Sequence, residues 1–203
     1  MFLGKWNRSV VITYLGMTFA VAGIMLVILS QQRYAVCCLI AAGICDLFDG
    51  AYARRCKRTD EEKEFGIQLD SLADVLDFIA LPIAVFIGAG LRHPLFIALY
   101  ALFSVCGVAR LAYFNMNTAT PEGTMDSYTG LPVTYTALIV PFAMLLKYVL
   151  PEVIFIIVFI ICIIAISLLN ILKIKVRKPR GIAYVIFSVL ALAMLIVYAV
   201  ILW

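Results

Sequence analysis

The organisation of this chain follows from residues 46–77, which read DLFDGAYARRCKRTDEEKEFGIQLDSLADVLD. This stretch joins the end of one apolar helix, near Arg54, to the start of another, near Gly66, through a short charged turn. Residues three or four apart on an α-helix share a face, so the acidic residues are predicted to form one stripe on each helix. The first stripe holds Asp46 and Asp49, and the second holds Asp70, Asp74 and Asp77.

If the two helices pair as an antiparallel hairpin, four or five carboxylates converge at a membrane boundary. An ionised Asp at the centre of a membrane helix costs ~2.5–3.5 kcal/mol, so such a cluster requires compensating positive charge. Divalent cations such as Mg²⁺ take oxygen ligands, and two of them balance four Asp side chains. A two-metal site clamps the attacking and leaving oxygens of a phosphoryl displacement. A lone intramembrane Asp usually serves a proton relay or a structural hydrogen bond, and this spacing disfavours both.

The composition indicates an all-α integral membrane protein. The chain has 203 residues, of which 65% are hydrophobic and 14% are charged, whereas soluble domains have roughly 45–50% and about 25%. This length predicts one membrane domain over residues 1–203. The apolar run 10–29 is too long for a signal-peptide core and lacks a small-residue cleavage site, so we expect it to be a retained first helix.

Apolar runs of about 20 residues can each cross a membrane, and they predict a polytopic bundle of about seven transmembrane helices. The runs cover residues 9–30, 33–55, 66–90, 94–118, 131–150, 152–172 and 180–203. With a cytoplasmic N-terminus, every Lys and Arg except Arg33, Arg92 and Lys147 falls on the cytoplasmic side. The Asp cluster then faces the cytoplasm, beside basic loops that can also contact anionic lipid headgroups.

Two residues beside the cluster suit a negatively charged substrate. Gly50 follows Asp49, and its missing side chain lets a ligand approach the backbone closely. Arg54 lies eight residues after Asp46 on roughly the same helix face, so it can reach a phosphate or brace a carboxylate. The site is therefore predicted to take a metal-bound anionic substrate.

The motif resembles the signature of the CDP-alcohol phosphatidyltransferase family. It reads Asp46-x-x-Asp49-Gly50-x-x-Ala53-Arg54, then eleven residues, then Gly66-x-x-x-Asp70-x-x-x-Asp74, with every fixed position of the signature present. The resemblance implies a membrane enzyme with a six-helix core, here with one helix more. Such an enzyme displaces CMP from a CDP-linked lipid with the hydroxyl of a small alcohol and uses two divalent cations, Mg²⁺ or Mn²⁺.

The resemblance also implies roles for the matched residues. The metal ligands are Asp46, Asp49, Asp70 and Asp74. Asp74 is also the implied catalytic base. The residues implied in CDP-lipid binding are Gly50, Ala53, Arg54 and Gly66. Asp77 lies outside the signature and receives no role from it.

Two later segments are similar to the phosphatidylserine synthase branch of this family. Residues 110–115 read RLAYFN and residues 128–133 read YTGLPV, which are similar to the R-L-A-x-F-N and G-L-P segments of that branch. Serine carries a carboxylate, to which the Arg110 guanidinium can donate two parallel hydrogen bonds. Asn115 can accept a hydrogen bond from the ammonium group of serine. The rest of the expected serine site is Gly130, Leu131 and Pro132. Each of these residues also has a structural explanation. Arg110 can anchor the helix at the membrane interface, Asn115 can cap a helix, and Pro132 can stand at a helix start.

The branch also places a Thr of the first helix in the CDP-lipid site, and Thr13 occupies that position here. Asn7-Arg8-Ser9 precedes it, where the branch usually has Pro-Asn. The implied partners are CDP-diacylglycerol, L-serine, membrane lipids and a second copy of the chain in a homodimer; no nucleic-acid partner is expected. The expected location is the plasma membrane of a prokaryote, with the N-terminus and active site on the cytoplasmic side.

Two alternative functions stay open. A sister enzyme would use inositol phosphate, glycerol phosphate or choline as the acceptor, and a phosphorylated acceptor would need additional basic residues near the site. A cation transporter would also carry acidic residues inside its helices. Transporters place such sites near the midplane on broken helices between inverted repeats, and this sequence has neither feature.

Overall fold

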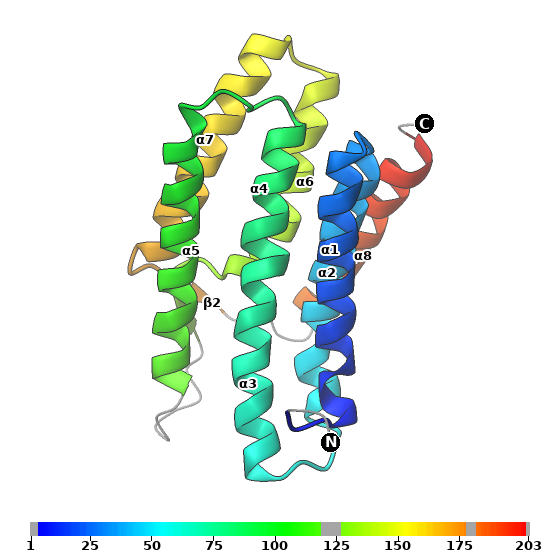
Figure 1. Cartoon of the computed structure of the whole chain (residues 1–203), viewed down its shortest axis with the longest axis vertical. Helices are drawn as coiled ribbons and strands as arrows, with labels where there is room; N and C mark the ends of the chain where they lie inside the picture. The colour runs from blue at the N-terminus through cyan, green and yellow to red at the C-terminus, as the bar shows by residue number, and fades with distance from the viewer. Residues whose placement is uncertain (1–3, 119–126, 178–181, 202–203) are drawn as a thin grey trace.

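The computed structural model describes residues 4–118, 127–177 and 182–201 as a bundle of helices that run up and down one long axis (Figure 1). The α-helices are α1 (Val11–Ile28), α2 (Gln32–Ala53), α3 (Asp60–Val75), α4 (Leu81–Gly88), α5 (Phe96–Thr118), α6 (Thr136–Leu145), α7 (Glu152–Ile171) and α8 (Ile182–Ile196). Short 3-10 turns are η1 (Arg8–Val10), η3 (Val133–Tyr135) and η4 (Leu146–Tyr148). Two π-helical turns are η2 (Leu76–Ala80) and η5 (Val197–Ile201).

Five helical segments are long and apolar enough to cross a membrane. They are Arg8–Ile28, Gln32–Ala53, Asp60–Gly88, Phe96–Met116 and Glu152–Ile171. Two shorter apolar helices are Val133–Tyr148 and Tyr184–Val200. Each segment falls on one of the runs expected from the sequence, which confirms the prediction of an all-α integral membrane bundle.

The third helix begins earlier than expected from the sequence. It starts at Asp60 rather than near Gly66, because Thr59 and Glu62 form a capping box. The Glu62 N–H donates to the Thr59 hydroxyl at 3.3 Å, and the Thr59 N–H donates to the Glu62 carboxylate at 2.8 Å. Lys63 adds an ion pair with Asp60 at 2.8 Å. The charged residues expected in a turn therefore form the first turn of α3.

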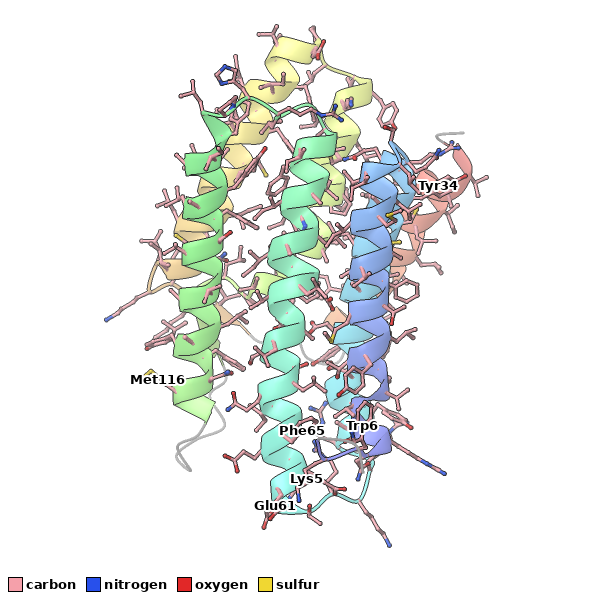
Figure 2. All side chains as sticks on the ribbon, in the orientation of Figure 1. Lys5, Trp6, Tyr34, Glu61, Phe65 and Met116 are labelled. Atoms are coloured by element: carbon pink, nitrogen blue, oxygen red, sulfur yellow. The ribbon has the colours of Figure 1, made fainter. Side chains whose placement is uncertain are left out.

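The segment before α1 folds against this end of α3. Lys5 Nζ lies 2.5 Å from a Glu61 carboxylate oxygen, and the hydrogen bond and charge of Glu61 raise the pKa of Lys5 (Figure 2). Asn7 donates to the carbonyl of Lys57 at 3.2 Å and accepts from the Ser9 N–H at 3.1 Å. The start of α1 is thus fixed beside the α2–α3 turn.

A π-helical turn interrupts the long helix at the end of the Asp stripe. The segment Asp60–Gly88 is continuous, but η2 lies between α3 and α4, and Pro82 stands in the first turn of α4. Proline has no N–H and its ring clashes with the carbonyl four residues earlier, here that of Phe78, so the preceding turn widens. Asp77 lies in the widened turn and is buried.

The buried face of α1 is built from small residues that let neighbouring helices approach closely. This face consists of Thr13, Gly16, Ala20, Gly23 and Val27. A Cβ on Gly16 would lie 2.8 Å from Oδ2 of Asp77, so only glycine leaves room for that carboxylate. The close approach holds Thr13 against the acidic residues of α2.

An aromatic core holds α4, α5 and α7 together away from the Asp stripe. Phe86 packs edge-on against Phe103 and Phe159, with ring centroids 5.4 and 5.5 Å apart. Phe86 follows Asp74 by twelve residues, which is about 18 Å along a helix axis. The apolar core and the acidic cluster therefore occupy different levels of the bundle.

A two-stranded antiparallel ribbon pairs the segment before α6 with the segment after α7, and it was not predicted from the sequence. Its strands are β1 (Ser127–Thr129) and β2 (Lys175–Arg177), with Thr129 opposite Lys175. Next to it, the Gly130 N–H donates to the Ile174 carbonyl at 2.7 Å, and the Leu131 N–H donates to the Leu169 carbonyl at 2.9 Å. These bonds attach the loop 130–132 to the end of α7.

Candidate functional site

Three aspartates from two helices converge at the centre of the site. Asp46 and Asp49 come from α2, and Asp70 comes from α3. One carboxylate oxygen from each residue lies within 4.8 Å of the others. The hairpin arrangement expected from the stripes on α2 and α3 therefore exists in the fold.

Asp74 and Asp77 extend this cluster by two further turns along the same helix. A small cavity is lined by these two residues together with Asp46, Asp49, Asp70, Thr13, Gly16, Cys45 and Ala73. Asp77 is 4% exposed, and its Oδ1 has no hydrogen-bond partner among the described residues. The hydroxyl of Thr13 donates to Oδ2 of Asp49 at 3.5 Å.

The electrostatics of the cluster favour a bound cation. Two ionised carboxylates with oxygens no more than 4.8 Å apart repel by at least roughly 3 kcal/mol at an effective dielectric constant of ~20. Hard oxygen donors from two rigid helices are the ligands that Mg²⁺ and Mn²⁺ prefer. The donor set of Asp46, Asp49 and Asp70 therefore fits a divalent metal ion, with Asp74 one turn away.

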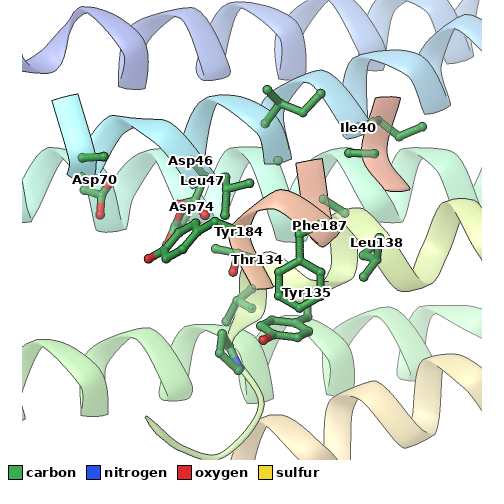
Figure 3. A pocket seen from close by; sticks show the side chains of 18 of the residues that line it. Ile40, Asp46, Leu47, Asp70, Asp74, Thr134, Tyr135, Leu138, Tyr184 and Phe187 are labelled. Atoms are coloured by element: carbon green, nitrogen blue, oxygen red, sulfur yellow. The ribbon is translucent and has the colours of Figure 1, made fainter. Parts of the chain in front are cut away.

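A larger cavity of about 300 Å³ opens beside the cluster. Figure 3 shows Asp46, Asp70 and Asp74 toward one end and Ile40, Leu138 and Phe187 toward the other. This volume is at the lower end of the range for small-molecule sites, roughly 300–1,000 Å³. The cavity thus combines an acidic end with an apolar end, which suits a molecule with a charged head and a lipid tail.

The residues expected to bind the CDP-lipid are only partly brought to this cavity. Gly50 and Arg54 line it, beside Asp46. Thr13 lines the smaller cavity and reaches Asp49. Ala53 and Gly66 lie outside the described lining residues of both cavities.

Only some of the residues expected to bind serine line the cavity. Arg110 is 6% exposed and lines the cavity, as does Pro132. Gly130 adjoins Arg110, because a Cβ on this glycine would lie 3.3 Å from the Arg110 Nε. Leu131 lies outside the described cavity lining.

Asn115, which is expected at the acceptor site, contacts α3 in the structure. Its Oδ1 accepts a hydrogen bond from the Ser71 hydroxyl at 2.9 Å, and it lies outside the described cavity lining. Ser71 follows Asp70 directly, so this contact braces α3 against α5 beside the cluster.

The protein family of this chain is established by comparison with known proteins. The profile of the CDP-alcohol phosphatidyltransferase family matches residues 6–203. The chain belongs to this family. The match includes the Asp46-to-Asp74 motif, which the structure places on α2 and α3.

The chain is similar to enzymes whose names specify a serine acceptor or a serine headgroup. Over 119 residues the chain is 35% identical to a CDP-diacylglycerol–serine O-phosphatidyltransferase of Helicobacter pylori, which covers 58% of this chain and 48% of the relative. It is 34% identical over 107 residues to a protein of the same name from Saccharomyces cerevisiae, covering 50% and 38%. It is 34% identical over 127 residues to an archaetidylserine synthase of Methanothermobacter thermautotrophicus, covering 61% and 52%. The matches span about half the length of these curated relatives or less.

The last helix contributes to the cavity, although no role was expected for it from the sequence. Tyr184 and Phe187 of α8 line the cavity with Tyr135. The Tyr135 and Phe187 rings meet edge-on with centroids 5.7 Å apart. Aromatic residues in an apolar helix carry no signal that distinguishes a cavity wall from ordinary packing, so only the fold reveals this contribution.

Proposed function

We propose that this enzyme transfers the phosphatidyl group of CDP-diacylglycerol to the hydroxyl of L-serine, forming phosphatidylserine and releasing CMP. The observation that carries this proposal is one cavity lined by both the Asp cluster and the buried Arg110. An ionised residue buried within a membrane segment is by default a candidate functional group. The names of the relatives from Helicobacter pylori and Saccharomyces cerevisiae support a serine acceptor.

The donor would bind with its pyrophosphate at the acidic end of the cavity. Arg54 can pair with a phosphate oxygen, and Gly50 leaves the backbone of α2 open to the nucleotide. The apolar end, between α2, α6 and α8, suits the diacylglycerol part. Asp46, Asp49, Asp70 and Asp74 would hold two divalent cations, Mg²⁺ or Mn²⁺. When bound, these ions supply charge neutralisation of the pyrophosphate and of the leaving CMP.

In the proposed chemical step, Asp74 is the general base that accepts the proton of the acceptor hydroxyl. The Asp74 carboxylate accepts the proton of the serine hydroxyl as the hydroxyl oxygen forms a bond to the β-phosphorus, which bears the diacylglycerol. The bond between this phosphorus and the oxygen bridging to CMP breaks, and CMP leaves with that oxygen. Asp74 suits this role because it lines both cavities, beside the other carboxylates and the space open to substrate.

Arg110 would select the acceptor by its carboxylate. A guanidinium makes two parallel hydrogen bonds to a carboxylate, which an acceptor such as choline or ethanolamine lacks. Burial strengthens this selection, because a charge in a site of low dielectric interacts more strongly with its partner. Asn115 would act indirectly, by holding α3 and α5 together through Ser71.

The proposed setting is the plasma membrane of a prokaryote. We place the N-terminus and the cavity on the cytoplasmic side, because most Lys and Arg residues flank that end of the helices. The chain would form one catalytic domain over residues 1–203 and act as a homodimer, as the family resemblance implies.

Incorporation of labelled L-serine by the purified full-length chain tests the proposal. With CDP-diacylglycerol and Mg²⁺ or Mn²⁺, the wild type should form phosphatidylserine and CMP, and chelation should stop the reaction. Asp74→Asn should abolish turnover but still bind the CDP-lipid, whereas Glu64→Gln, an exposed change on the same helix, should retain activity. A product with another headgroup, or an active Asp74→Asn variant, would overturn the serine acceptor or the base assignment respectively.

A further inference from the structure

Tyr184 lines the large cavity, but neither the signature motif nor the proposed reaction uses its hydroxyl. It belongs to α8, whose other described cavity-lining residues are Phe187 and Ala191. These two residues lie three and seven positions further along the helix, so all three share one face. In Figure 3, Tyr184 reaches from α8 toward the end of the cavity that holds Asp70 and Asp74, whereas Phe187 lies nearer the apolar end. The cavity face of α8 therefore changes from polar to apolar in the same direction as the cavity itself.

Two contacts hold α8 in place beside the cavity. The Phe187 ring meets the Tyr135 ring edge-on, with centroids 5.7 Å apart. In the turn η5 that follows α8, the Tyr198 hydroxyl donates to the carbonyl of Pro141 in α6 at 2.6 Å. Tyr198 is 1% exposed, so its hydroxyl serves the packing of the helices, whereas the side chain of Tyr184 is accessible, with 38% of the residue exposed. The fold thus fixes the helix that carries Tyr184 and leaves Tyr184 itself open to a ligand.

A tyrosine at this point has two physical explanations. Tyrosine is enriched at membrane interfaces, where its ring lies among lipids and its hydroxyl meets the headgroups. A tyrosine in a cavity wall can instead pack its ring against the apolar part of a ligand and donate its hydroxyl hydrogen to a polar group. The place of Tyr184 in the cavity lining and its direction toward the acidic end (Figure 3) favour the second explanation. A charged phosphate oxygen is the strongest hydrogen-bond acceptor that the proposed CDP-lipid brings to this end of the cavity.

We propose that Tyr184 binds the substrate directly, by donating a hydrogen bond from its hydroxyl to a non-bridging oxygen of the phosphate that bears the diacylglycerol. The inference rests on the proposed function and adds a second element, α8, to the polar contacts of the donor. The proposed donor has its pyrophosphate beside the Asp cluster and its acyl chains at the apolar end, so the phosphate that joins these parts lies at the boundary between them. Tyr184 stands at this boundary. Its contact orients the phosphorus for the acceptor and favours ligands that carry this second phosphate over CMP, which lacks it.

The test compares Tyr184→Phe with the control Tyr148→Phe in the purified full-length chain. Tyr148 lies in η4, is 58% exposed and lies outside the described cavity lining. Calorimetry with Mg²⁺ and no acceptor measures the affinity for CDP-diacylglycerol and for CMP. Loss of one hydrogen bond to a charged group should weaken CDP-diacylglycerol binding roughly tenfold in Tyr184→Phe, while CMP binding stays within about twofold. Tyr148→Phe should change neither affinity.

A second variant, Tyr184→Leu, also lacks the hydroxyl and keeps the result decisive if phenylalanine disturbs the packing of α8. Both variants should unfold near the wild-type temperature and share the selective loss of CDP-diacylglycerol affinity. An unchanged affinity in either folded variant, as an interfacial anchor would give, or an equal loss for CDP-diacylglycerol and CMP, would overturn the role of Tyr184. A wild type that fails to bind CDP-diacylglycerol would refute the donor of the proposed function and this contact with it. A wild type that binds this donor but uses another alcohol would refute the serine acceptor alone, and the comparison, which needs no acceptor, would still decide Tyr184.

Discussion

Replacing Asp70 with Asn should stabilise the chain without metal and weaken its response to metal. The carboxylate oxygens of Asp46, Asp49 and Asp70 lie within 4.8 Å of one another, so each pair in which both carboxylates are ionised repels by at least roughly 3 kcal/mol at an effective dielectric constant of ~20. Asp70→Asn removes two of the three pairs. Side-chain rotation and entering water reduce the gain, and we expect about 1–3 kcal/mol of added stability in chelator.

Thermal unfolding of the detergent-purified chain measures this effect. For a chain of about 200 residues, 1 kcal/mol shifts the Tm by about 2–4 °C, so Asp70→Asn should unfold roughly 5 °C higher than the wild type in EDTA. Titration with Mg²⁺ or Mn²⁺ should raise the Tm of the wild type above that of Asp70→Asn. Binding at 100 times the Kd stabilises the wild type by about 2.7 kcal/mol, and the variant, with one ligand fewer, should gain less.

A matched control separates this effect from a general change of charge. Glu64→Gln removes one exposed carboxylate from the same helix, outside the cluster, and should leave both Tm values near those of the wild type. If Asp70→Asn unfolds at or below the wild-type temperature in EDTA and gains as much from metal, the three carboxylates do not share an ion.

Three further predictions concern the acceptor side and the fold. Arg110→Lys should raise the KM for L-serine at least about tenfold and the KM for CDP-diacylglycerol far less, since an ammonium cannot form the bidentate fork; equal kinetic effects would remove Arg110 from the serine pocket. Gly130→Ala should cost about 1–3 kcal/mol in thermal unfolding, because its φ is +79° and the new Cβ would lie 2.7 Å from the Asn170 carbonyl oxygen; an unchanged Tm would argue against this tight loop. Thr59→Ala should cost about 1 kcal/mol by loss of the helix cap while serine incorporation continues; inactivation as complete as in Asp74→Asn would contradict a purely structural cap.

The acidic half of the site could be predicted because its geometry is local. Helical periodicity alone places Asp70 and Asp74 on one face of α3, and a short connection forces α2 and α3 to run antiparallel. The structure brings Asp46, Asp49 and Asp70 together as expected. The start of α3 was predicted too late in the sequence, near Gly66. The Thr59–Glu62 capping box, which is also a local pattern, extends the helix through the charged residues to Asp60.

The sequence by itself determined the membrane-spanning character, the helical class and the Asp motif, because hydrophobic length and residue spacing act within single segments. Only the tertiary structure decided which distant segments share the cavity. It placed Arg110 and Pro132 along the cavity wall with α8 and set Asn170 beneath the 130–132 loop, while Ala53, Gly66 and Asn115 lie outside the described cavity lining. The physical reason is that helix neighbours depend on small-residue packing and on backbone bonds between remote segments, such as Leu131 to Leu169, which no local pattern encodes.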